Sequence, residues 1–338
     1  MNELSEYEGK TILVTGGAGC IGSTLCRRLS ELQVKKIIIL DNLSSSYEWN
    51  IPRAENIKFL SGDILDDGIL YGVFAEKPEY VFHMAAHSGN QNSVDHPERN
   101  LMVNGLGILM MLRKAAQCGV KRFVYSSAGC GVYGINSSLP FKEDDVSVCL
   151  QTPYQVTKLL GELYANCYHY LYQVPVVNAR FSDVFGPGDA PGRYRSVIPN
   201  FFYWGMNNQS LPIPGDGGET RDWTYVDDIV AGLLRMGICE EAVGESINLG
   251  SGTEISMLEM AKMVNRLTGN NAGVSFTKQQ EWEVQKRELL SIEKAQKMLG
   301  YQPKISFAEG LRHVNRWFKE NWAAIEESVE FPKEHVLV

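Results

Sequence analysis

Short apolar runs alternate with longer amphipathic stretches along the first half of the chain. Six runs rich in β-branched residues have the length and composition of strands that are buried on both faces. They lie at residues 11–14, 36–40, 57–60, 80–83, 122–125 and 174–178. The stretches between them place apolar residues three and four positions apart, most clearly over 97–118 and 153–172, which predicts helices. Strands that alternate with helices in this way predict a doubly wound parallel sheet.

The pattern changes after residue 185, where Gly- and Pro-rich stretches separate shorter elements. These stretches cover 186–192 and 212–218. Loops of this composition commonly carry binding groups. Helices are predicted near 226–236, 257–267, 292–299 and 307–322. This half of the chain is therefore predicted to contain a smaller, ligand-binding lobe.

A glycine-rich turn joins the first predicted strand to a predicted helix. It reads Thr15-Gly-Gly-Ala-Gly-Cys-Ile-Gly22. Glycines at 16, 19 and 22 (Gly16, Gly19 and Gly22) permit a tight turn, close approach to a pyrophosphate and close helix–strand packing. The helix N-terminus offers unpaired N–H groups to the phosphates. The turn is predicted to bind a dinucleotide, with Cys20 and Ile21 among its contacts and the Cys20 thiol in a packing role.

An acidic residue, Asp41, ends the second predicted strand. A carboxylate there can accept both ribose hydroxyls of NAD and repel a 2′-phosphate. No arginine follows immediately, so NAD is predicted rather than NADP. Further cofactor contacts are expected from Asn42, Ser44, Asp63 and Ile64.

Tyr154 and Lys158 follow Pro153 at the start of a predicted helix. Residues four apart share one helical face, so the Lys158 ammonium is expected near the Tyr154 phenol. Lowering the phenol pKa from about 10 to about 7 requires roughly 4 kcal/mol of preferential stabilisation of the phenolate. A neighbouring ammonium and a cationic nicotinamide ring can supply it. The pair is predicted to be catalytic and to contact the cofactor.

Composition narrows the class of function. Of 338 residues, 44% are apolar and 21% charged, which suits a globular protein with a packed core. A net charge of −8 disfavours nucleic-acid binding, and no apolar run is long enough to span a membrane. The seven cysteines show no metal-type spacing, so no metal site is predicted. Reduced thiols favour a cytoplasmic location.

The motifs form a series that resembles the extended short-chain dehydrogenase/reductase family, specifically its NAD-dependent nucleotide-sugar epimerases and dehydratases. The series comprises Thr15–Gly22, Asp41-Asn-Leu, Gly62-Asp63-Ile64, His83-Met-Ala-Ala86, Asn104, Val132-Tyr-Gly134, Pro153-Tyr-x-x-x-Lys158, Arg180-Phe-Ser-Asp-Val-Phe-Gly-Pro187 and Arg221-Asp-Trp-Thr-Tyr-Val-Asp-Asp228. The expected α/β fold is a Rossmann-type doubly wound parallel sheet with a smaller C-terminal substrate-binding lobe. The NAD-binding domain is expected over 1–180, with later segments returning to it, the lobe mainly over 181–325 and a tail over 326–338.

The resemblance also implies roles for single residues. In such enzymes the tyrosine removes a sugar hydroxyl proton while C4 gives hydride to NAD⁺, and the lysine holds the nicotinamide ribose. A Ser or Thr beside the fifth strand bonds the sugar O4, and Ser127 is the candidate here. Asn104 would brace a helix near the cofactor. The chain would approach the cofactor at Ala85, Ala86 and Phe181.

Two departures from the family pattern affect these assignments. The stretch Ser126-Ser-Ala-Gly-Cys-Gly131 is one residue longer than usual, so an alignment from its right-hand end places Gly129 at the position assigned to Ser127. Asp183 stands where the family usually has Asn against the substrate.

The same loop favours one reaction. Related dehydratases carry an Asp-Glu pair just before Val132-Tyr-Gly134, because elimination of water needs a positioned proton donor. The loop 128–131 has no acid, so C4 epimerisation through a transient 4-keto sugar is favoured. A 4,6-dehydratase or a 4-ketoreductase is the alternative within the class. A non-catalytic NAD-sensing or scaffold protein is the alternative outside it, and the presence of Tyr154 and Lys158 argues against that.

The predicted ligand besides NAD is a nucleotide-diphosphate sugar. Guanidinium groups suit diphosphate oxygens, and the candidates are Arg195, Arg221 and Arg287. Asp183 is the candidate contact for the sugar. A homodimer built on the helices predicted over 97–118 and 153–172 is expected, as in the enzymes that the chain resembles.

Overall fold

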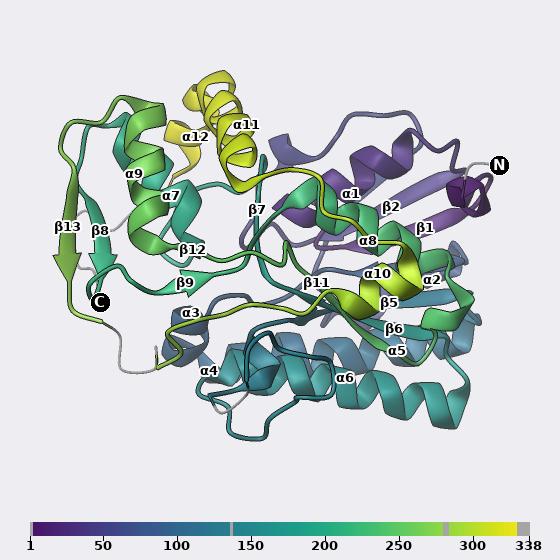
Figure 1. The fold of residues 1–338 in the computed structure, drawn as a ribbon. Helices are drawn as coiled ribbons and strands as arrows, with labels where there is room; N and C mark the ends of the chain where they lie inside the picture. The colour runs from purple at the N-terminus through teal and green to yellow at the C-terminus, as the bar shows by residue number, and fades with distance from the viewer. Residues whose placement is uncertain (1–2, 136–137, 280–283, 330–338) are drawn as a thin grey trace.

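A parallel β-sheet forms the centre of the fold in the computed structural model, which describes residues 3–135, 138–279 and 284–329 (Figure 1). The strand order is β11-β6-β5-β4-β1-β2-β3, and every neighbouring pair is parallel. The strands are β1 (Thr11–Thr15), β2 (Lys36–Asp41), β3 (Ile57–Ser61), β4 (Tyr80–His83), β5 (Arg122–Ala128), β6 (Val176–Phe181) and β11 (Ser246–Leu249). The predicted doubly wound sheet is confirmed, with β11 returning to its edge from the second half of the chain.

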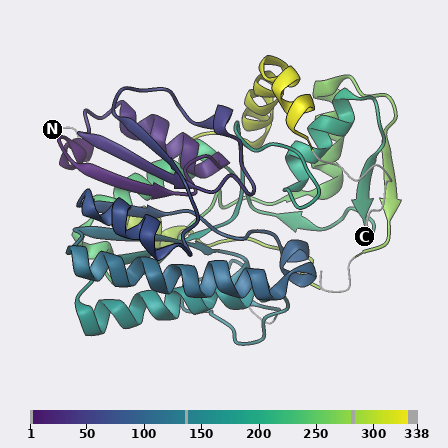
Figure 2. The ribbon, with the colours of Figure 1, turned by 180° about the vertical axis from the view of Figure 1, so that it is seen from behind.

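Some helices pack on the two faces of the sheet, whereas others, such as α7 and α9, pack with the short strands of the second half of the chain. Their bounds are α1 (Cys20–Ser30), α2 (Asp67–Ala75), α3 (Asn90–Asp95), α4 (Pro97–Asn100), α5 (Gly107–Cys118), α6 (Pro153–Tyr172), α7 (Val197–Met206), α8 (Val226–Ile238), α9 (Met257–Thr268), α10 (Glu293–Leu299), α11 (Phe307–Glu320) and α12 (Trp322–Ser328). α1 and α8 pack together on one face, whereas α2, α5 and α6 cover the other (Figure 2).

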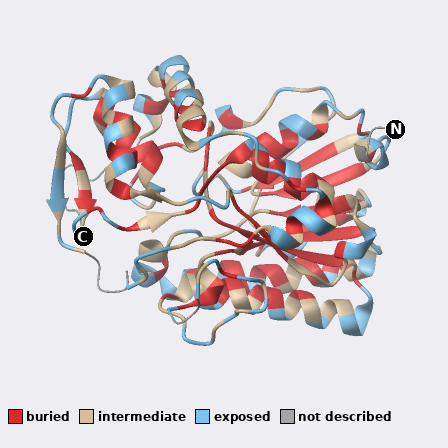
Figure 3. Cartoon of the chain, in the orientation of Figure 1, coloured by how far each residue is buried: buried red, intermediate tan, exposed pale blue. Residues whose placement is uncertain are grey.

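The sheet separates two apolar clusters, because successive side chains of a strand point to opposite faces. On β1, Ile12 and Val14 belong to one cluster and Leu13 to the other. Apart from the edge strand β3, which is only partly buried, the strands of the sheet are buried along nearly their whole length, as the burial colours show (Figure 3). Strands buried on both faces are expected to read as continuous apolar runs, which is why the sequence located them well.

The helix predicted over 97–118 is divided into α4, a π-helical turn η3 (Leu101–Leu106) and α5. A π-helical turn is wider than an α-helical one and interrupts the regular hydrogen bonding. Asn104 lies within this turn, buried against the chain that follows β4. The helix over 153–172 forms as predicted, with Pro153 in its first turn and the Thr152 side chain accepting the backbone N–H of Gln155.

The second half of the chain adds three short strand pairs beside the sheet. The parallel pairs are β7 (Asp183–Phe185) with β10 (Trp223–Tyr225) and β8 (Leu211–Pro214) with β13 (Val274–Thr277); β9 (Thr220–Arg221) and β12 (Ile255–Ser256) are antiparallel. Phe201 of α7 and Val264 of α9 belong to the same apolar cluster as Ile12 of β1. The two halves therefore share one core.

The predicted helix over 307–322 ends at Glu320, and a separate helix, α12, begins at Trp322. Most of the predicted tail, residues 330–338, lies outside the described residues. Within the described ranges, no helix has both the length and the apolar composition needed to cross a membrane.

Candidate active site

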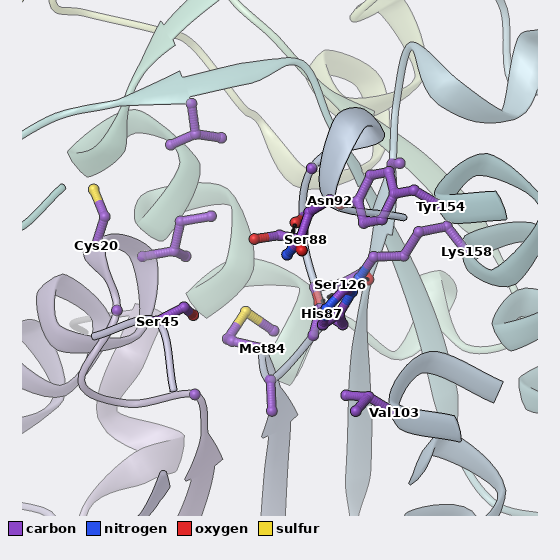
Figure 4. A pocket seen from close by; sticks show the side chains of 18 of the residues that line it. Cys20, Ser45, Met84, His87, Ser88, Asn92, Val103, Ser126, Tyr154 and Lys158 are labelled. Atoms are coloured by element: carbon purple, nitrogen blue, oxygen red, sulfur yellow. Dashed lines mark hydrogen bonds between the residues drawn. The ribbon is translucent and has the colours of Figure 1, made fainter. Parts of the chain in front are cut away.

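A cleft of about 760 Å³ opens at the carboxyl ends of the central strands (Figure 4). It lies where the strand order reverses between β1 and β4, the usual ligand position in a doubly wound sheet. Tyr154 and Lys158 flank one side, and Cys20 and Ser45 lie on the other. The sequence-predicted residues that line it are Gly16, Gly19, Cys20, Ile21, Gly22, Asp41, Asn42, Ser44, Asp63, Ile64, Ala85, Ala86, Ser127, Tyr154, Lys158, Phe181, Asp183 and Arg195.

The glycine turn leaves no room for side chains where it passes β4 and α1. Gly16 has φ +68°, and a Cβ there would lie 2.7 Å from the Ala85 nitrogen. A Cβ on Gly22 would collide with the Gly16 carbonyl oxygen. The Cys20 thiol donates to the Pro187 carbonyl at 3.5 Å, and burial raises its pKa well above the usual range. The turn thus presents backbone to a phosphate, and Cys20 packs as a protonated thiol.

Asp41 is held rigidly at the end of β2. Its carboxylate accepts the backbone N–H groups of Ala18 at 3.0 Å and Leu43 at 2.8 Å, and the Ser46 hydroxyl at 2.9 Å. These contacts fix the carboxylate beside the glycine turn. A short acceptor at this place suits the ribose hydroxyls of a dinucleotide, so the residues present fit NAD.

Asp63 is engaged by two donors rather than standing alone. Asn42 Nδ2 lies 3.0 Å and Arg99 Nη2 2.8 Å from its Oδ2. Arg99 also lines the cleft, but it lies in α4 and sequence reasoning missed it. The signal that could have found Arg99 is its place in the chain soon after β4, because segments that follow parallel strands lie at the carboxyl edge of the sheet.

Tyr154 and Lys158 lie on one face of α6, as their spacing predicts. Lys158 Nζ lies 5.7 Å from the centre of the Tyr154 ring and donates to the Ser126 carbonyl at 2.7 Å. Burial lowers the pKa of Lys158 to about 7, and the charge of Glu162 opposes this shift. Burial, with the charge of Asp183, raises the pKa of Tyr154 above its usual value. The phenolate therefore needs positive charge nearby.

Ser127 lines the cleft, and its hydroxyl is engaged by a buried carboxylate. The hydroxyl donates to Glu162, which also forms a two-pronged pair with Arg180, Nε to Oε1 at 2.9 Å and Nη2 to Oε2 at 2.7 Å. The alternative position, Gly129, is closed to side chains, since a Cβ there would lie 2.8 Å from Leu290 Cδ1. Of the two alternative positions, only Ser127 therefore carries a hydroxyl, and that hydroxyl bonds Glu162.

Three further predicted residues, Asn104, Arg221 and Arg287, lie outside the cleft lining. Asn104 accepts the His87 N–H at 2.8 Å and donates to Thr157 at 3.2 Å, which ties the chain after β4 to α6. Arg221 lies 3.6 Å from Glu288 and 3.9 Å from Glu219, with little exposure.

Arg287 differs from its predicted role. Its side chain is 60% exposed, and Nη2 pairs with Glu254 at 2.6 Å. Arg195 does line the cleft, where it donates to the Ser45 carbonyl. Pro187, earlier in the same loop, accepts the hydrogen bond from Cys20 of the cofactor turn.

A carboxylate from far along the chain completes the cleft. Glu288 lines it, and burial, with the charges of Glu288, Asp183 and Asp222, raises the pKa of the Cys130 thiol. Its segment is held by the Glu288 N–H donating to Thr220 at 3.1 Å and by a bridge between Phe141 and Leu290. The loop 128–131 has no acid of its own, but the fold brings one to it. No local sequence signal marks Glu288, because its place depends on these distant contacts.

Within the described ranges, His, Cys, Asp and Glu side chains form no group of three or more suited to hold a metal ion.

Three features meet in one cleft: a glycine turn at a helix N-terminus, the carboxylate of Asp41 at the end of β2, and the pair Tyr154 and Lys158. Together they define a dinucleotide-dependent enzyme of the short-chain dehydrogenase type. The chain belongs to the NAD dependent epimerase/dehydratase family, whose match covers residues 12–250. Its cofactor is accordingly NAD, as the sequence predicted.

Relatives and solved structures agree with this assignment. The chain is 34% identical to a UDP-glucose 4-epimerase of Mycolicibacterium smegmatis, over 91% of this chain and 98% of the relative. It is 33% identical to a UDP-glucuronate 4-epimerase of Thermodesulfobacterium geofontis, over 91% and 96%. The structure of an epimerase from Methanothermobacter thermautotrophicus is 61% identical, with TM-score 0.97 and 98% of each chain covered.

Proposed function

We propose that this chain is an NAD-dependent nucleotide-sugar 4-epimerase that works through a transient 4-keto sugar. The observation that carries the proposal is the position of Tyr154 and Lys158 on the same cleft as the glycine turn and Asp41. Bound NAD⁺ would accept hydride from the sugar C4 and return it to the same carbon. The similarity to UDP-glucose 4-epimerase supports this reaction.

The protein groups divide the work around the sugar. Tyr154 takes the proton of the C4 hydroxyl and gives it back after the hydride returns. The ammonium of Lys158, anchored on the Ser126 carbonyl, favours the phenolate electrostatically and reaches toward the nicotinamide ribose. Asp41 and the glycine turn hold the adenosine and pyrophosphate, with Asn42, Ser44, Asp63 and Ile64 beside them.

The nucleotide-diphosphate sugar would bind between the sheet and the lobe. We place Asp183 at the sugar and Arg195 and Arg221 near the diphosphate. Arg221 would exchange part of its contact with Glu219 and Glu288 for phosphate oxygens. Arg287 would first have to leave Glu254, so its part is the weakest of the three.

A 4,6-dehydratase is the second candidate, because Glu288 supplies the carboxyl group that the loop 128–131 lacks in sequence. Dehydration requires loss of the C5 proton and of water, whereas C4 epimerisation requires neither.

The two reactions are separated by running the turnover of UDP- and dTDP-sugars in deuterated water and resolving the products by NMR. An epimerase gives the C4 epimer with no deuterium on carbon and no net NADH. Deuterium at C5 with a 4-keto-6-deoxy product would replace the epimerase assignment by the dehydratase.

We also propose that the enzyme is a cytoplasmic homodimer. All seven cysteines are unpaired in the structure, which suits a reducing compartment. Apolar side chains are exposed on η3 and α6, which pack against each other, including Leu101, Met102, Leu106, Val156 and Leu163. Exposed apolar faces of this kind mark contact sites between proteins.

Light scattering tests the dimer. The wild-type protein should have twice the mass of one chain at micromolar concentration, and Leu163→Glu should give a monomer. Tyr71→Glu, on the exposed face of α2, is the control that should stay dimeric. A monomeric wild-type mass would refute the dimer.

A further inference from the structure

The first turn of α6, which carries Tyr154, is fastened to the short helix α3. The Tyr154 N–H donates to the Ser93 hydroxyl at 3.0 Å, and the Thr152 hydroxyl donates to Asn90 Oδ1 at 2.8 Å. Ser93 and Asn90 both lie in α3, and Ser93 is fully buried. Two side-chain contacts therefore join α3 to the start of the helix that carries the catalytic pair.

The Ser93 hydroxyl is fixed in the direction that serves Tyr154. A hydroxyl has one O–H donor and two lone pairs that can accept. The Ser93 O–H donates to the Asn90 carbonyl at 2.7 Å, so its lone pairs remain for the Tyr154 N–H. Helix α3 is itself held by the loop after β7, where the Tyr194 hydroxyl donates to Asp95 at 2.8 Å. Ser93 is thus an acceptor on a segment that is anchored at both ends.

The other residues of the first turn of α6 do not use α3 in this way. The first N–H groups of a helix have no acceptor within that helix. Pro153 has no N–H, and the Gln155 N–H bonds the Thr152 side chain just before the helix. The Tyr154 N–H is bound by Ser93 instead. The backbone of Tyr154 is therefore placed by a different helix from its own.

We propose that Ser93 is a positioning residue, which holds the first turn of α6 so that the Tyr154 phenol meets the sugar hydroxyl. This inference rests on the proposed function, in which Tyr154 is the base. Lys158, one turn later, is fixed separately through the Ser126 carbonyl. Without the Ser93 hydroxyl the first turn shifts while Lys158 keeps its place, and a reacting group misplaced by about 1 Å can lower a rate about a hundredfold.

The test compares kcat and KM of Ser93→Ala with those of the wild-type enzyme, for the better substrate of UDP-glucose and UDP-N-acetylglucosamine. Ser93 lies outside the cleft lining, so the variant removes no contact with a ligand. The value of kcat should fall about ten- to a hundredfold, while KM stays within about threefold.

Ser256→Ala is the matched control. The Ser256 hydroxyl accepts the Glu259 N–H at 3.2 Å in the first turn of α9, and Ser256 also lies outside the cleft lining. This variant loses the same kind of contact at another helix and should keep the wild-type kcat. Ser93→Cys, of similar size but with a weaker acceptor, should lower kcat in the same direction and serves if Ser93→Ala does not fold.

Two kinetic results would overturn the inference. The first is a kcat within about twofold of wild type in the Ser93 variants, because the hydroxyl would then not matter to the base. The second is an equal loss of kcat in Ser256→Ala, because the loss of any first-turn contact would then explain the effect.

Hydrogen exchange read by mass spectrometry tests the contact without turnover. In Ser93→Ala a peptide spanning residues 148–158 should gain one fast-exchanging amide, because the Tyr154 N–H loses its acceptor. A peptide spanning 160–172 should be unchanged. If no sugar is epimerised, the proposed function fails, and exchange still decides: an unchanged 148–158 peptide would overturn the inference, whereas faster exchange would keep Ser93 as the residue that holds this turn.

Discussion

Replacing Glu162 by Gln should destabilise the fold strongly while preserving its shape. Glu162 and Arg180 are 2% and 4% exposed and form two hydrogen bonds with each other. Removing one partner of a buried ion pair typically costs about 3–5 kcal/mol, because the remaining charge stays buried. Arg180 cannot turn out to water easily, since it also donates to the Glu143 carbonyl at 2.7 Å and the Tyr133 hydroxyl at 3.1 Å.

Urea unfolding at neutral pH measures this loss of unfolding free energy. Glu76→Gln is the matched control, because Glu76 pairs with Lys36 and Lys58 at the surface. Exposed ion pairs contribute little to stability because solvent screens them, so the control should lose much less unfolding free energy than Glu162→Gln. A loss for Glu162→Gln as small as that for Glu76→Gln would refute the reasoning.

The same variant should change the pH dependence of turnover. Burial lowers the pKa of Lys158 to about 7, and the charge of Glu162 opposes this shift. Activity that depends on the charged lysine is lost as pH rises through this pKa. Without Glu162 the pKa falls further, so the alkaline limb of the kcat profile should move to lower pH. A limb that stays in place would contradict the electrostatic link.

Three further predictions concern single residues. Tyr154→Phe should abolish turnover and retain bound NAD; activity within about tenfold of wild type would exclude the base. Ser127→Ala should cost about 1 kcal/mol of stability and less than about tenfold in kcat, because its hydroxyl bonds Glu162. Burial, with the charge of Lys158, lowers the pKa of folded-state His83 to about 3. As pH falls below about 6.5, the unfolded chain therefore binds a proton that the folded chain does not, and the unfolding free energy drops by about 1.4 kcal/mol per pH unit. His83→Gln should flatten this slope, as measured by urea unfolding at pH 7.5 and pH 5.

The parts of the site that rest on local pattern could be predicted from the sequence. The glycine turn follows β1 directly, Asp41 ends β2, and Tyr154 and Lys158 share one helical face. Each of these needs only the order of neighbouring residues and the rule that the carboxyl ends of parallel strands meet at one edge.

Other parts depend on contacts between distant segments. Ser127 bonds Glu162 because β5 packs against α6, and Glu288 reaches Cys130 because its segment is held by Thr220 and Phe141. Arg287 pairs with Glu254 on the surface for the same kind of reason. Sequence patterns give the type of these residues but not their partners, so the contacts of Ser127 with Glu162 and of Arg287 with Glu254 were not predicted, and Glu288 was missed.

The apolar cluster that joins β1 to α7 and α9 makes the two halves of the molecule one cooperative unit. Heating should melt them in a single calorimetric transition, and a chain ending at residue 180 would lose the edge strand β11 and would expose the sheet face that α8 covers. Shared packing of this kind also resists a hinge rotation of the lobe against the sheet.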